Sequence, residues 1–293
     1  MSLETKNILI TGSQGFIGKQ LVKELLKEKK YRLHYLFHKH FKHFLNIDTC
    51  IHLAAKADDV LYNKNTKEYI KSNVDYTLKV AQTYLESGLK RFIFMSSIKV
   101  YGSSGHFKET DSTQPDSAYA VSKMIAEQKL IALFKGYPKS QLIILRIPLV
   151  YGVNNKANMA KLITYTKKRY PLPLGCATAK RSFLSIDNLI LCIKELLKHS
   201  YNGIYNIADS NSISAKELSK VLSIELTGKK PRLIYIPKRM FWLISKINKP
   251  VNKMFQRLFL TFTMNTEKIK KDLANLKLLS TNQAIKNLSK KIK

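Results

Sequence analysis

The chain has 293 residues, of which 51 are Lys or Arg and 20 are Asp or Glu, so its formal net charge is +31. Its 45% hydrophobic content, with 15 Tyr and 13 Phe, excludes a disordered chain and suffices for one large domain or two coupled ones. The three cysteines Cys50, Cys176 and Cys192 are far apart, which argues against a disulfide framework and predicts a cytoplasmic protein.

The strongly basic balance suits nucleic acid, an anionic membrane surface or a phosphorylated ligand. No zinc-finger, basic-zipper or RNA-recognition motif accompanies it, so we expect no nucleic-acid partner. The alternative is a lysine-rich surface that is simply solvated. No apolar run reaches the length of a transmembrane helix, and the stretch before the first expected strand leaves no room for a signal peptide.

Short apolar runs alternate with helical patterns along the first half of the chain. Strands are expected at about 7–11, 33–37, 49–53, 92–95 and 142–147, and helices at about 16–30, 67–86 and 118–134. Buried strands that alternate with helices predict an α/β fold, a doubly wound Rossmann-type parallel sheet with both faces covered.

The pattern loosens after Gly152, and no clean domain boundary follows from the sequence. A loop is expected at 171–175, a helix from Asp187 to about residue 198, and a late strand at 203–207 that returns to the main sheet. The last 65 residues, 229–293, look mainly helical and hold 17 basic and 2 acidic residues.

A glycine-rich turn follows the first strand. Gly12, Gly15 and Gly18 recur every third residue, and Phe16 and Ile17 open the helix that follows. Glycine permits a tight turn, a close approach of backbone to a pyrophosphate, and close packing of helix on sheet. The helix N-terminus offers free N–H groups to phosphates. The position between strand and helix predicts dinucleotide binding, and a tight turn without a ligand is the alternative.

The second strand is not followed by the acidic residue that usually binds the ribose of NAD. His38-Lys39-His40 stands there instead, and a basic cluster tolerates the 2′-phosphate of NADP. NAD and NADP both stay open, because the same residues also suit a solvated loop. His34 and His43 add to the histidines here, but they match no zinc-ligand pattern, so we predict no metal site.

Tyr119 and Lys123 are spaced one helical turn apart, on one face of an expected helix. A phenol is a poor base at neutral pH, but a nearby ammonium favours the phenolate and lowers its pKa. Ser97 ends an expected strand at the carboxyl edge of the sheet, where doubly wound folds bind ligands. These three residues are candidates for catalysis, whereas an ordinary amphipathic helix is the alternative for the pair.

The order of these motifs resembles the extended short-chain dehydrogenases/reductases, the NAD-dependent epimerase/dehydratase group that acts on nucleotide sugars. More narrowly, the chain resembles the UDP-N-acetylhexosamine branch, with its UDP-glucose 4-epimerase-like enzymes and its 4-keto reductases that form UDP-N-acetylquinovosamine. The segments that carry the resemblance are TGSQGFIG at 11–18, HLAA at 52–55, SSIKVYG at 96–102, YAVSK at 119–123, RIPLVYG at 146–152, NKAN at 155–158, YPLPLG at 170–175 and RSFLSIDNL at 181–189.

The resemblance implies roles for individual residues. Tyr119 would be the general acid and base, Lys123 would hold the ribose and tune Tyr119, and Ser97 would bind the C4 oxygen. Pro148 would lie near the nicotinamide, and three residues would line the cofactor: Leu53, Ala54 and Ala55.

Asn158, Arg181 and Arg257 are the residues that the resemblance implies for the diphosphate of a nucleotide sugar. For Arg181 there is also a physical reason, because a guanidinium pairs bidentately with phosphate. The alternative for each arginine is a surface ion pair. The resemblance also implies a homodimer that pairs the helices near 67–86 and 118–134.

Three features depart from the family pattern. The span from Gly18 to Ile51 is short, so we expect the sheet to lack one strand and the adenine pocket to be altered. Tyr76 stands where the family usually has glycine. The tail at 272–276 lacks the usual LGW-like ending.

These observations and the resemblance predict an NAD(P)-dependent nucleotide-sugar enzyme. We expect a dinucleotide-binding domain over 1–155, with a returning segment at 183–210, and a smaller C-terminal substrate lobe over 156–182 and 211–293. The first hypothesis is hydride transfer to C4 of a UDP-linked, N-acetylated 6-deoxy 4-keto hexose for surface polysaccharide synthesis. A UDP-hexose or UDP-N-acetylhexosamine 4-epimerase with retained NAD is the near alternative. A non-catalytic nucleotide-binding protein is the alternative of another class.

The basic tail carries a separate hypothesis. Between Lys238 and Phe262, basic residues alternate with large apolar ones, which suits an amphipathic helix at a membrane interface. The apolar positions are Phe241, Trp242, Ile244, Phe255, Leu258 and Phe259. An ordinary helix of the substrate lobe is the alternative.

Overall fold

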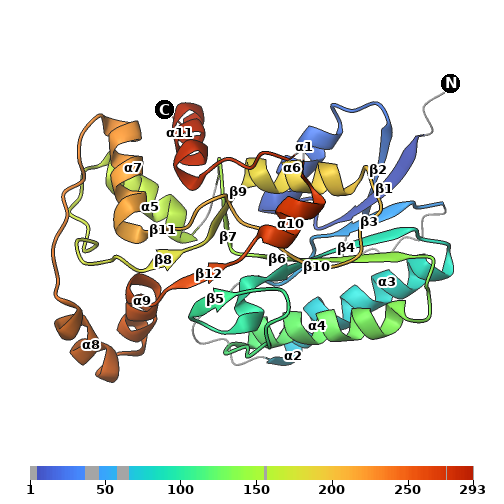
Figure 1. Ribbon diagram of the computed structural model, residues 1–293, viewed down its shortest axis with the longest axis horizontal. Helices are drawn as coiled ribbons and strands as arrows, with labels where there is room; N and C mark the ends of the chain where they lie inside the picture. The colour runs from blue at the N-terminus through green and yellow to red at the C-terminus, as the bar shows by residue number, and fades with distance from the viewer. Residues whose placement is uncertain (1–4, 37–45, 58–65, 155–156, 275, 293) are drawn as a thin grey trace. The chain divides into compact units, whose positions relative to one another are not determined.

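The computed structural model describes residues 5–36, 46–57, 66–154, 157–274 and 276–292 (Figure 1). The chain forms two compact units. Unit 1 comprises Met1–Gly102, Glu109–Ile147 and Ile190–Asn206. Unit 2 comprises Ser103–Lys108, Pro148–Leu189 and Ile207–Lys293. Among the described residues, no helix is both long and apolar enough to cross a bilayer.

Unit 1 is built on a six-stranded, wholly parallel sheet with the strand order β10-β6-β4-β3-β1-β2. All four residues of β3 and six of the seven in β4 and in β6 are buried, as expected when helices cover both faces. The strands are β1 (Lys6–Thr11), β2 (Tyr31–Leu36), β3 (Thr49–His52), β4 (Arg91–Ser97), β6 (Gln141–Ile147) and β10 (Gly203–Asn206).

Helices lie on both faces of this sheet. Figure 1 shows α1 (Phe16–Leu25) on one face, and α3 (Tyr76–Glu86) and α4 (Ala118–Phe134) on the other. Phe92 and Phe94 are alternate residues of β4, so they share a face and pack in one core cluster with Val80 of α3 and Leu130 of α4. The fold class predicted from the alternation of apolar runs is confirmed.

The order of the strands locates the ligand edge of the sheet. From β1 the chain passes to β2 on one side and then to β3 on the other, so the direction of winding reverses between β1 and β3. Open α/β sheets bind ligands at the carboxyl ends of the strands at such a point. In the described part of the chain β2 is the edge strand. Residues 37–45, on which the expected loss of one strand depends, lie outside the described residues.

The predicted late strand is confirmed. β10 pairs in parallel with β6, with Tyr205 opposite Leu145. The expected domain boundaries differ from the units, because β7 (Leu149–Tyr151) and β9 (Phe183–Ser185) pair with each other rather than with the large sheet. Unit 1 therefore ends at Ile147 and resumes only at Ile190.

Unit 2 combines the β7–β9 pair with a four-stranded sheet of order β11-β8-β12-β5. The tail is mainly helical as expected, but it also contributes strand β12, which pairs in parallel with β5 and β8. The strands of this sheet are β5 (Gly105–Phe107), β8 (Lys180–Arg181), β11 (Ile213–Ser214) and β12 (Phe262–Met264). The helices are α5 (Ala157–Lys167), α7 (Ala215–Thr227), α8 (Lys238–Ile247), α9 (Lys249–Phe259), α10 (Glu267–Asp272) and α11 (Thr281–Ile292); α6 (Ile186–Leu196) starts here and continues into unit 1.

Candidate active site

The glycine-rich turn joins β1 to α1 at the ligand edge of the sheet. Gly12 has a φ of +69°, and a Cβ placed on it would lie 2.7 Å from the backbone nitrogen of Ala54. A Cβ on Gly18 would lie 2.7 Å from the Cα of Ser13, so α1 packs directly on the turn. Both positions require glycine, because one needs a left-handed backbone and the other leaves no space for a side chain.

The turn presents donors that suit a bound phosphate. The first turn of α1 carries no acidic residue, and Gly15 precedes it as the N-cap without a side-chain cap. The hydroxyl of Ser13 is buried, and it has no hydrogen-bond partner in the described part of the chain. Free helix N–H groups and an orphaned hydroxyl are what a dinucleotide diphosphate would satisfy, so the residues present fit this cofactor.

We expect Gly12→Ala to weaken NAD(H) binding at least about tenfold, because the added Cβ collides with the Ala54 backbone beside the phosphate turn. The left-handed backbone should also cost about 1–2 kcal/mol of stability. Calorimetric titration with NADH and urea unfolding measure the two effects.

Gly88→Ala is the matched control for this substitution. Gly88 has a φ of +83°, but a Cβ placed on it would meet no atom within 4 Å. The control variant should therefore lose only the stability that the left-handed backbone costs, without the collision, and keep the affinity for NADH. An equal loss of affinity in both variants would contradict the role of the turn.

A directional chain of hydrogen bonds connects the ends of β1 and β3. The Ala54 N–H donates to Thr11 Oγ1 at 3.2 Å, and Thr11 Oγ1 lies 2.9 Å from Nδ1 of His52. Nε2 of His52 lies 2.9 Å from Thr77 Oγ1, whose O–H donates to the Asn73 carbonyl at 2.8 Å. These partners fit one arrangement, in which Thr11 donates to Nδ1 and the neutral imidazole donates from Nε2.

Burial agrees with the neutral form, because it lowers the pKa of His52 to about 3, and the charge of Lys123 acts in the same direction. Tyr76, at the position where the resemblance led us to expect glycine, lies beside this histidine with the ring centroids 5.9 Å apart. The histidine chain thus fixes the loop after β3 against the glycine turn.

Asn73 is a buried residue beside the candidate site that the sequence analysis missed. It is fully buried in a π-helical turn (Lys71–Asp75) between α2 (Thr66–Ile70) and α3. Its Oδ1 accepts from the Lys56 N–H at 2.7 Å, and its Nδ2 donates to the Lys56 carbonyl at 3.1 Å and to Ser122 Oγ at 2.9 Å. Asn73 therefore ties the loop after β3 to the residue that precedes Lys123, and such single π-helical turns occur often at functional sites.

Tyr119 and Lys123 lie on the first turns of α4, as the sequence predicts. Ser117 caps this helix, because its hydroxyl accepts from the Ala120 N–H at 3.3 Å. Lys123 is buried, and its Nζ donates to the Met95 carbonyl at 2.7 Å, two residues before Ser97. The half-buried Tyr119 ring lies 6.5 Å from the ring of Tyr69.

Ser97 ends β4 and caps a short 3-10 turn (Ile98–Tyr101). Its Oγ accepts from the Lys99 N–H at 3.3 Å, so its own hydrogen is still available for donation. Lys99 also places its Nζ 5.9 Å from the centre of the Tyr119 ring. Tyr119, Lys123 and Ser97 are therefore all in unit 1, near the ends of α4 and β4.

Burial sets the charge state of the lysine. It lowers the pKa of Lys123 to about 7, and the nearby Glu127 carboxylate acts in the opposite direction. Glu127 itself is bound by Arg146, with Nη2 2.6 Å from Oε2 and Nε 3.1 Å from the same oxygen, and both side chains are almost fully buried. Ser96 donates to the other carboxylate oxygen, Oε1.

The remaining predicted cofactor residues lie in both units, Pro148 being the first residue of its segment in unit 2. Phe16, Ile17, Leu53, Ala54 and Ala55 are half-buried at the start of α1 and in the loop after β3. Pro148 is buried and directly follows β6. His38, Lys39, His40 and His43 lie outside the described residues, and the residues that are described hold no cluster of three or more His, Cys, Asp or Glu side chains that could bind a metal.

In unit 2, the structure brings Arg181 and Arg257 close enough to repel one another. Burial lowers the pKa of Arg181 to about 10, and the positive charge of Arg257 adds to this effect. Arg181 stacks 5.0 Å from the ring centre of Phe262, and its Nη1 donates to the Leu260 carbonyl at 3.4 Å. Arg257 and Asn158 are exposed, on α9 and at the start of α5.

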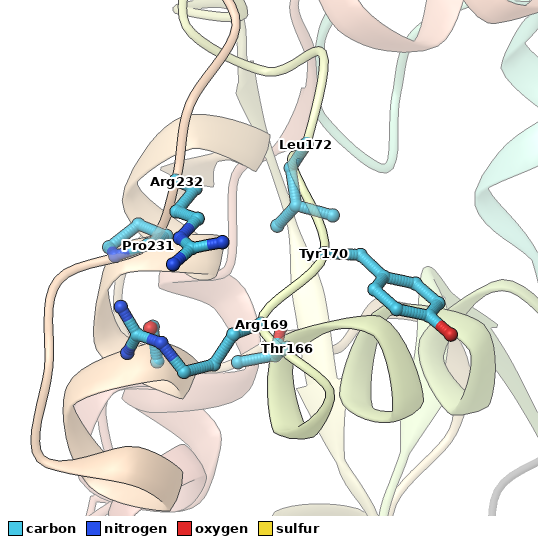
Figure 2. Close-up of a pocket in the computed structure, with 7 residues that line it drawn as sticks. Thr166, Arg169, Tyr170, Leu172, Pro231 and Arg232 are labelled. Atoms are coloured by element: carbon cyan, nitrogen blue, oxygen red, sulfur yellow. The ribbon is translucent and has the colours of Figure 1, made fainter.

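Figure 2 shows a different pocket in unit 2, which none of the predicted site residues lines. Its lining residues are Thr166, Arg169, Tyr170, Leu172, Ser223, Pro231 and Arg232. Arg169 has a φ of +55° just after α5, and the Tyr170 N–H donates back to the Tyr165 carbonyl at 3.0 Å, a pattern that ends helices. The Arg169 guanidinium also reaches Thr227, the last residue of α7, at 3.4 Å. The C-terminal ends of helices favour cations, so Arg169 stabilises the C-terminal ends of α5 and α7.

The fold and the site define the class of protein. The chain belongs to the NAD dependent epimerase/dehydratase family, whose model matches residues 8–208. It is therefore an NAD(P)-dependent enzyme of the nucleotide-sugar type, as the motifs predicted.

Among curated proteins, the chain is 33% identical over 255 residues to the UDP-glucose 4-epimerase of Vibrio cholerae, covering 75% of this chain and 76% of the relative. It is 26% identical over 249 residues to the N-acetyl-alpha-D-glucosaminyl-diphospho-ditrans,octacis-undecaprenol 4-epimerase of Escherichia coli O157:H7, covering 78% and 74%. Its fold is similar to the UDP-N-acetylglucosamine 4-epimerase of Methanobrevibacter ruminantium M1, solved in complex with UDP-N-acetylmuramic acid, with a TM-score of 0.79, 20% identity and 98% of each chain covered.

Proposed function

We propose that the protein transfers hydride at C4 of a UDP-linked hexose, with Tyr119 as the acid and base. The observation that carries this proposal is the buried Lys123, which lies one helical turn from Tyr119 and is fixed to the Met95 carbonyl at the end of β4. All three relatives named above are 4-epimerases, so 4-epimerisation of a UDP-hexose or UDP-N-acetylhexosamine is our first candidate. Reduction of a UDP-linked 4-keto-6-deoxy sugar uses the same residues and is the second.

Bound NAD(P) supplies the hydride acceptor and donor for C4. Tyr119 takes the proton of the C4 hydroxyl when C4 is oxidised and returns a proton to that oxygen when C4 is reduced. The charged form of Lys123 favours the Tyr119 phenolate, and the Ser97 hydroxyl, whose hydrogen is available, aligns the C4 oxygen. The bonds from Lys123 and Asn73 hold these groups in place before substrate arrives.

A single assay separates the two candidates. The epimerase should interconvert UDP-glucose and UDP-galactose, or their N-acetylated forms, without added cofactor. The reductase should instead consume one NAD(P)H for each 4-keto sugar. Failure of the purified protein to do either would overturn the proposal.

The diphosphate of the substrate is our proposed ligand for Arg181 and Arg257. Two guanidiniums that repel each other would gain from a doubly charged anion between them, and charged hydrogen bonds to phosphate are strong. A sugar linked through diphosphate to undecaprenol, the substrate in the name of the Escherichia coli relative, would offer the same anion. Parallel assays with both donors decide between a nucleotide and a lipid carrier.

We expect Arg181→Ala to raise the KM for the UDP-sugar roughly tenfold to a hundredfold, since a hydrogen bond to a charged group is worth about 1.5–3 kcal/mol. The kcat should change little, because Arg181 is proposed to bind the diphosphate and not the reacting carbon. Arg169→Ala, in the pocket of Figure 2, is the control and should leave KM unchanged. A KM that rises equally in both variants would contradict the assignment.

A cytoplasmic location, a homodimer and a role in surface polysaccharide synthesis remain predictions. Light scattering tests the dimer. If the dimer forms through the α3 and α4 surfaces, as the family resemblance implies, a charged substitution of the exposed Ile131 on α4 should shift the protein to monomer.

A further inference from the structure

The segment 226–266 carries an unusual charge. It contains nine Lys or Arg residues and no Asp or Glu, so it is uniformly basic over about forty residues. Within it, α8 and α9 lie side by side in unit 2, as Figure 1 shows. Asn248 separates the two helices, because its side chain accepts from the Val251 N–H at 3.2 Å and starts α9. The single amphipathic helix expected over 238–262 is therefore wrong.

The apolar residues named from the sequence mostly face inward. Phe241, Phe255 and Leu258 are buried in one cluster with Ala177, and Phe259 packs against them. The Phe255 and Phe259 rings are 5.1 Å apart. These side chains hold α8 and α9 to the rest of unit 2, so their apolar surface is not available to a binding partner. Ile244 was also named from the sequence, but its side chain is not among those that the structure describes.

A second set of apolar residues faces outward. On α8, Met240 is 48% exposed, Trp242 45% and Leu243 59%. Phe241 and Ser245 mark the inner face of this helix, and Leu243 lies opposite them by the 100° rotation per residue. Among the described side chains, six of the thirteen large hydrophobic ones that are more than a third exposed belong to residues 234–254. Met240, Trp242 and Leu243 on α8 form the apolar patch.

Basic side chains surround the apolar patch. Lys238 and Arg239 are exposed at the start of α8, and Lys246 places its Nζ 3.7 Å from the centre of the Trp242 ring. The Lys246–Trp242 pair combines an amphipathic ring with a cation, the combination that is favoured at membrane–water interfaces. The exposed aliphatic side chains of Met240 and Leu243 beside these cations suit a lipid headgroup region better than a nucleic acid, because they can insert among acyl chains but offer no ring on which a base could stack.

We propose that the outer surface of α8 is a peripheral docking site for an anionic lipid bilayer. Trp242, Leu243 and Met240 insert at the level of the headgroups, while the basic side chains neutralise the lipid charge. The affinity is reversible and falls as salt rises, because part of it is electrostatic. This proposal does not depend on the reaction that the enzyme catalyses.

The experiment uses the only tryptophan in the chain, which is Trp242 itself. Vesicles with half anionic phosphatidylglycerol and half phosphatidylcholine should shift its emission to shorter wavelengths and carry the full-length protein into the pellet. Pure phosphatidylcholine vesicles should do neither at the same lipid concentration. Brominated acyl chains should quench the emission, which shows insertion directly.

Two matched pairs of variants locate the contact. Leu243→Ser should weaken vesicle binding, whereas Leu26→Ser, with 63% exposure in unit 1, should not. Removal of two basic charges should weaken binding about 25-fold, at about fivefold per charge. Lys238→Glu with Arg239→Glu should show at least this loss, and Lys286→Glu with Lys290→Glu on α11 should show much less.

Several results would overturn the proposal. The proposal is wrong if the protein stays in the supernatant with anionic vesicles at low salt. It is also wrong if Leu243→Ser and Leu26→Ser weaken vesicle binding equally, or if the two double charge substitutions do. An emission shift that follows protein concentration without lipid would assign the surface to a second copy of the chain. A shift with RNA but not with vesicles would assign it to nucleic acid.

Discussion

Tyr119→Phe should lower kcat roughly 10²–10⁴-fold, the usual contribution of a positioned general acid and base. The substitution removes only the phenolic oxygen, and the ring should keep its contact with Tyr69, 6.5 Å away. The Ser117 cap of α4 and the bond from Lys123 to the Met95 carbonyl should persist, because neither bond involves the phenolic oxygen. Turnover of UDP-sugar, followed by the change in sugar configuration or in NAD(P)H absorbance, measures the loss.

Cofactor binding separates a catalytic role from a structural one. The dissociation constant for NADH should stay almost unchanged in Tyr119→Phe, because the glycine turn carries the phosphates. Tyr165→Phe, a 45% exposed tyrosine of unit 2, is the control and should keep full activity. Unchanged turnover in Tyr119→Phe would refute the role of the phenol, and loss of NADH binding would show a structural defect instead.

Glu127→Gln should destabilise the protein by about 3–5 kcal/mol, the cost of breaking a buried ion pair by removing one partner. Arg146 is 4% exposed, and its two shortest bonds end on the Glu127 carboxylate, so the variant leaves a buried guanidinium with a neutral partner. Urea unfolding followed by circular dichroism measures the loss.

A double substitution is the control for this pair. Glu127→Leu with Arg146→Met replaces both charges with apolar groups and should recover most of the lost stability, because no charge remains buried. If the double variant is as unstable as the single one, packing and not charge accounts for the effect.

The same carboxylate should influence the pH profile. Burial lowers the pKa of Lys123 to about 7, and Glu127 raises it, so removal of Glu127 should lower the pKa further. Above its pKa the lysine is neutral and no longer favours the Tyr119 phenolate, so kcat should fall as the pH rises through that value. In Glu127→Gln this fall should begin at a lower pH. The dependence of kcat on pH, measured below the unfolding range, tests this.

Features with local causes could be predicted from the sequence. A left-handed turn and a helix packed on a strand each require glycine, so Gly12 and Gly18 could be recognised without any tertiary information. The helical period places Tyr119 and Lys123 one turn apart, and the apolar runs place the strands of the sheet. The parallel direction of the strands followed from their alternation with helices.

Features that join distant segments could not be predicted in this way. Asn73 was visible only as a polar residue inside a helical segment, and its bonds to Lys56 and Ser122 depend on how three elements meet. Glu127 and Arg146 belong to a helix and a strand, and nothing in either segment indicates that they pair. For 238–262, apolar residues occur around both helices, so the pattern did not reveal which of them would be buried.

The sequence by itself determined the family, the parallel sheet, the cofactor turn and the identity of the proposed acid and base, because each depends on residue type and on spacing along one element. The tertiary structure alone decided the charge state and the surroundings of these groups. In the folded chain Lys123 is buried, the positive charge of Arg257 acts on Arg181, and Trp242 is exposed beside Lys246. Burial and charge proximity are properties of the packed chain, since they arise only where segments far apart in sequence meet.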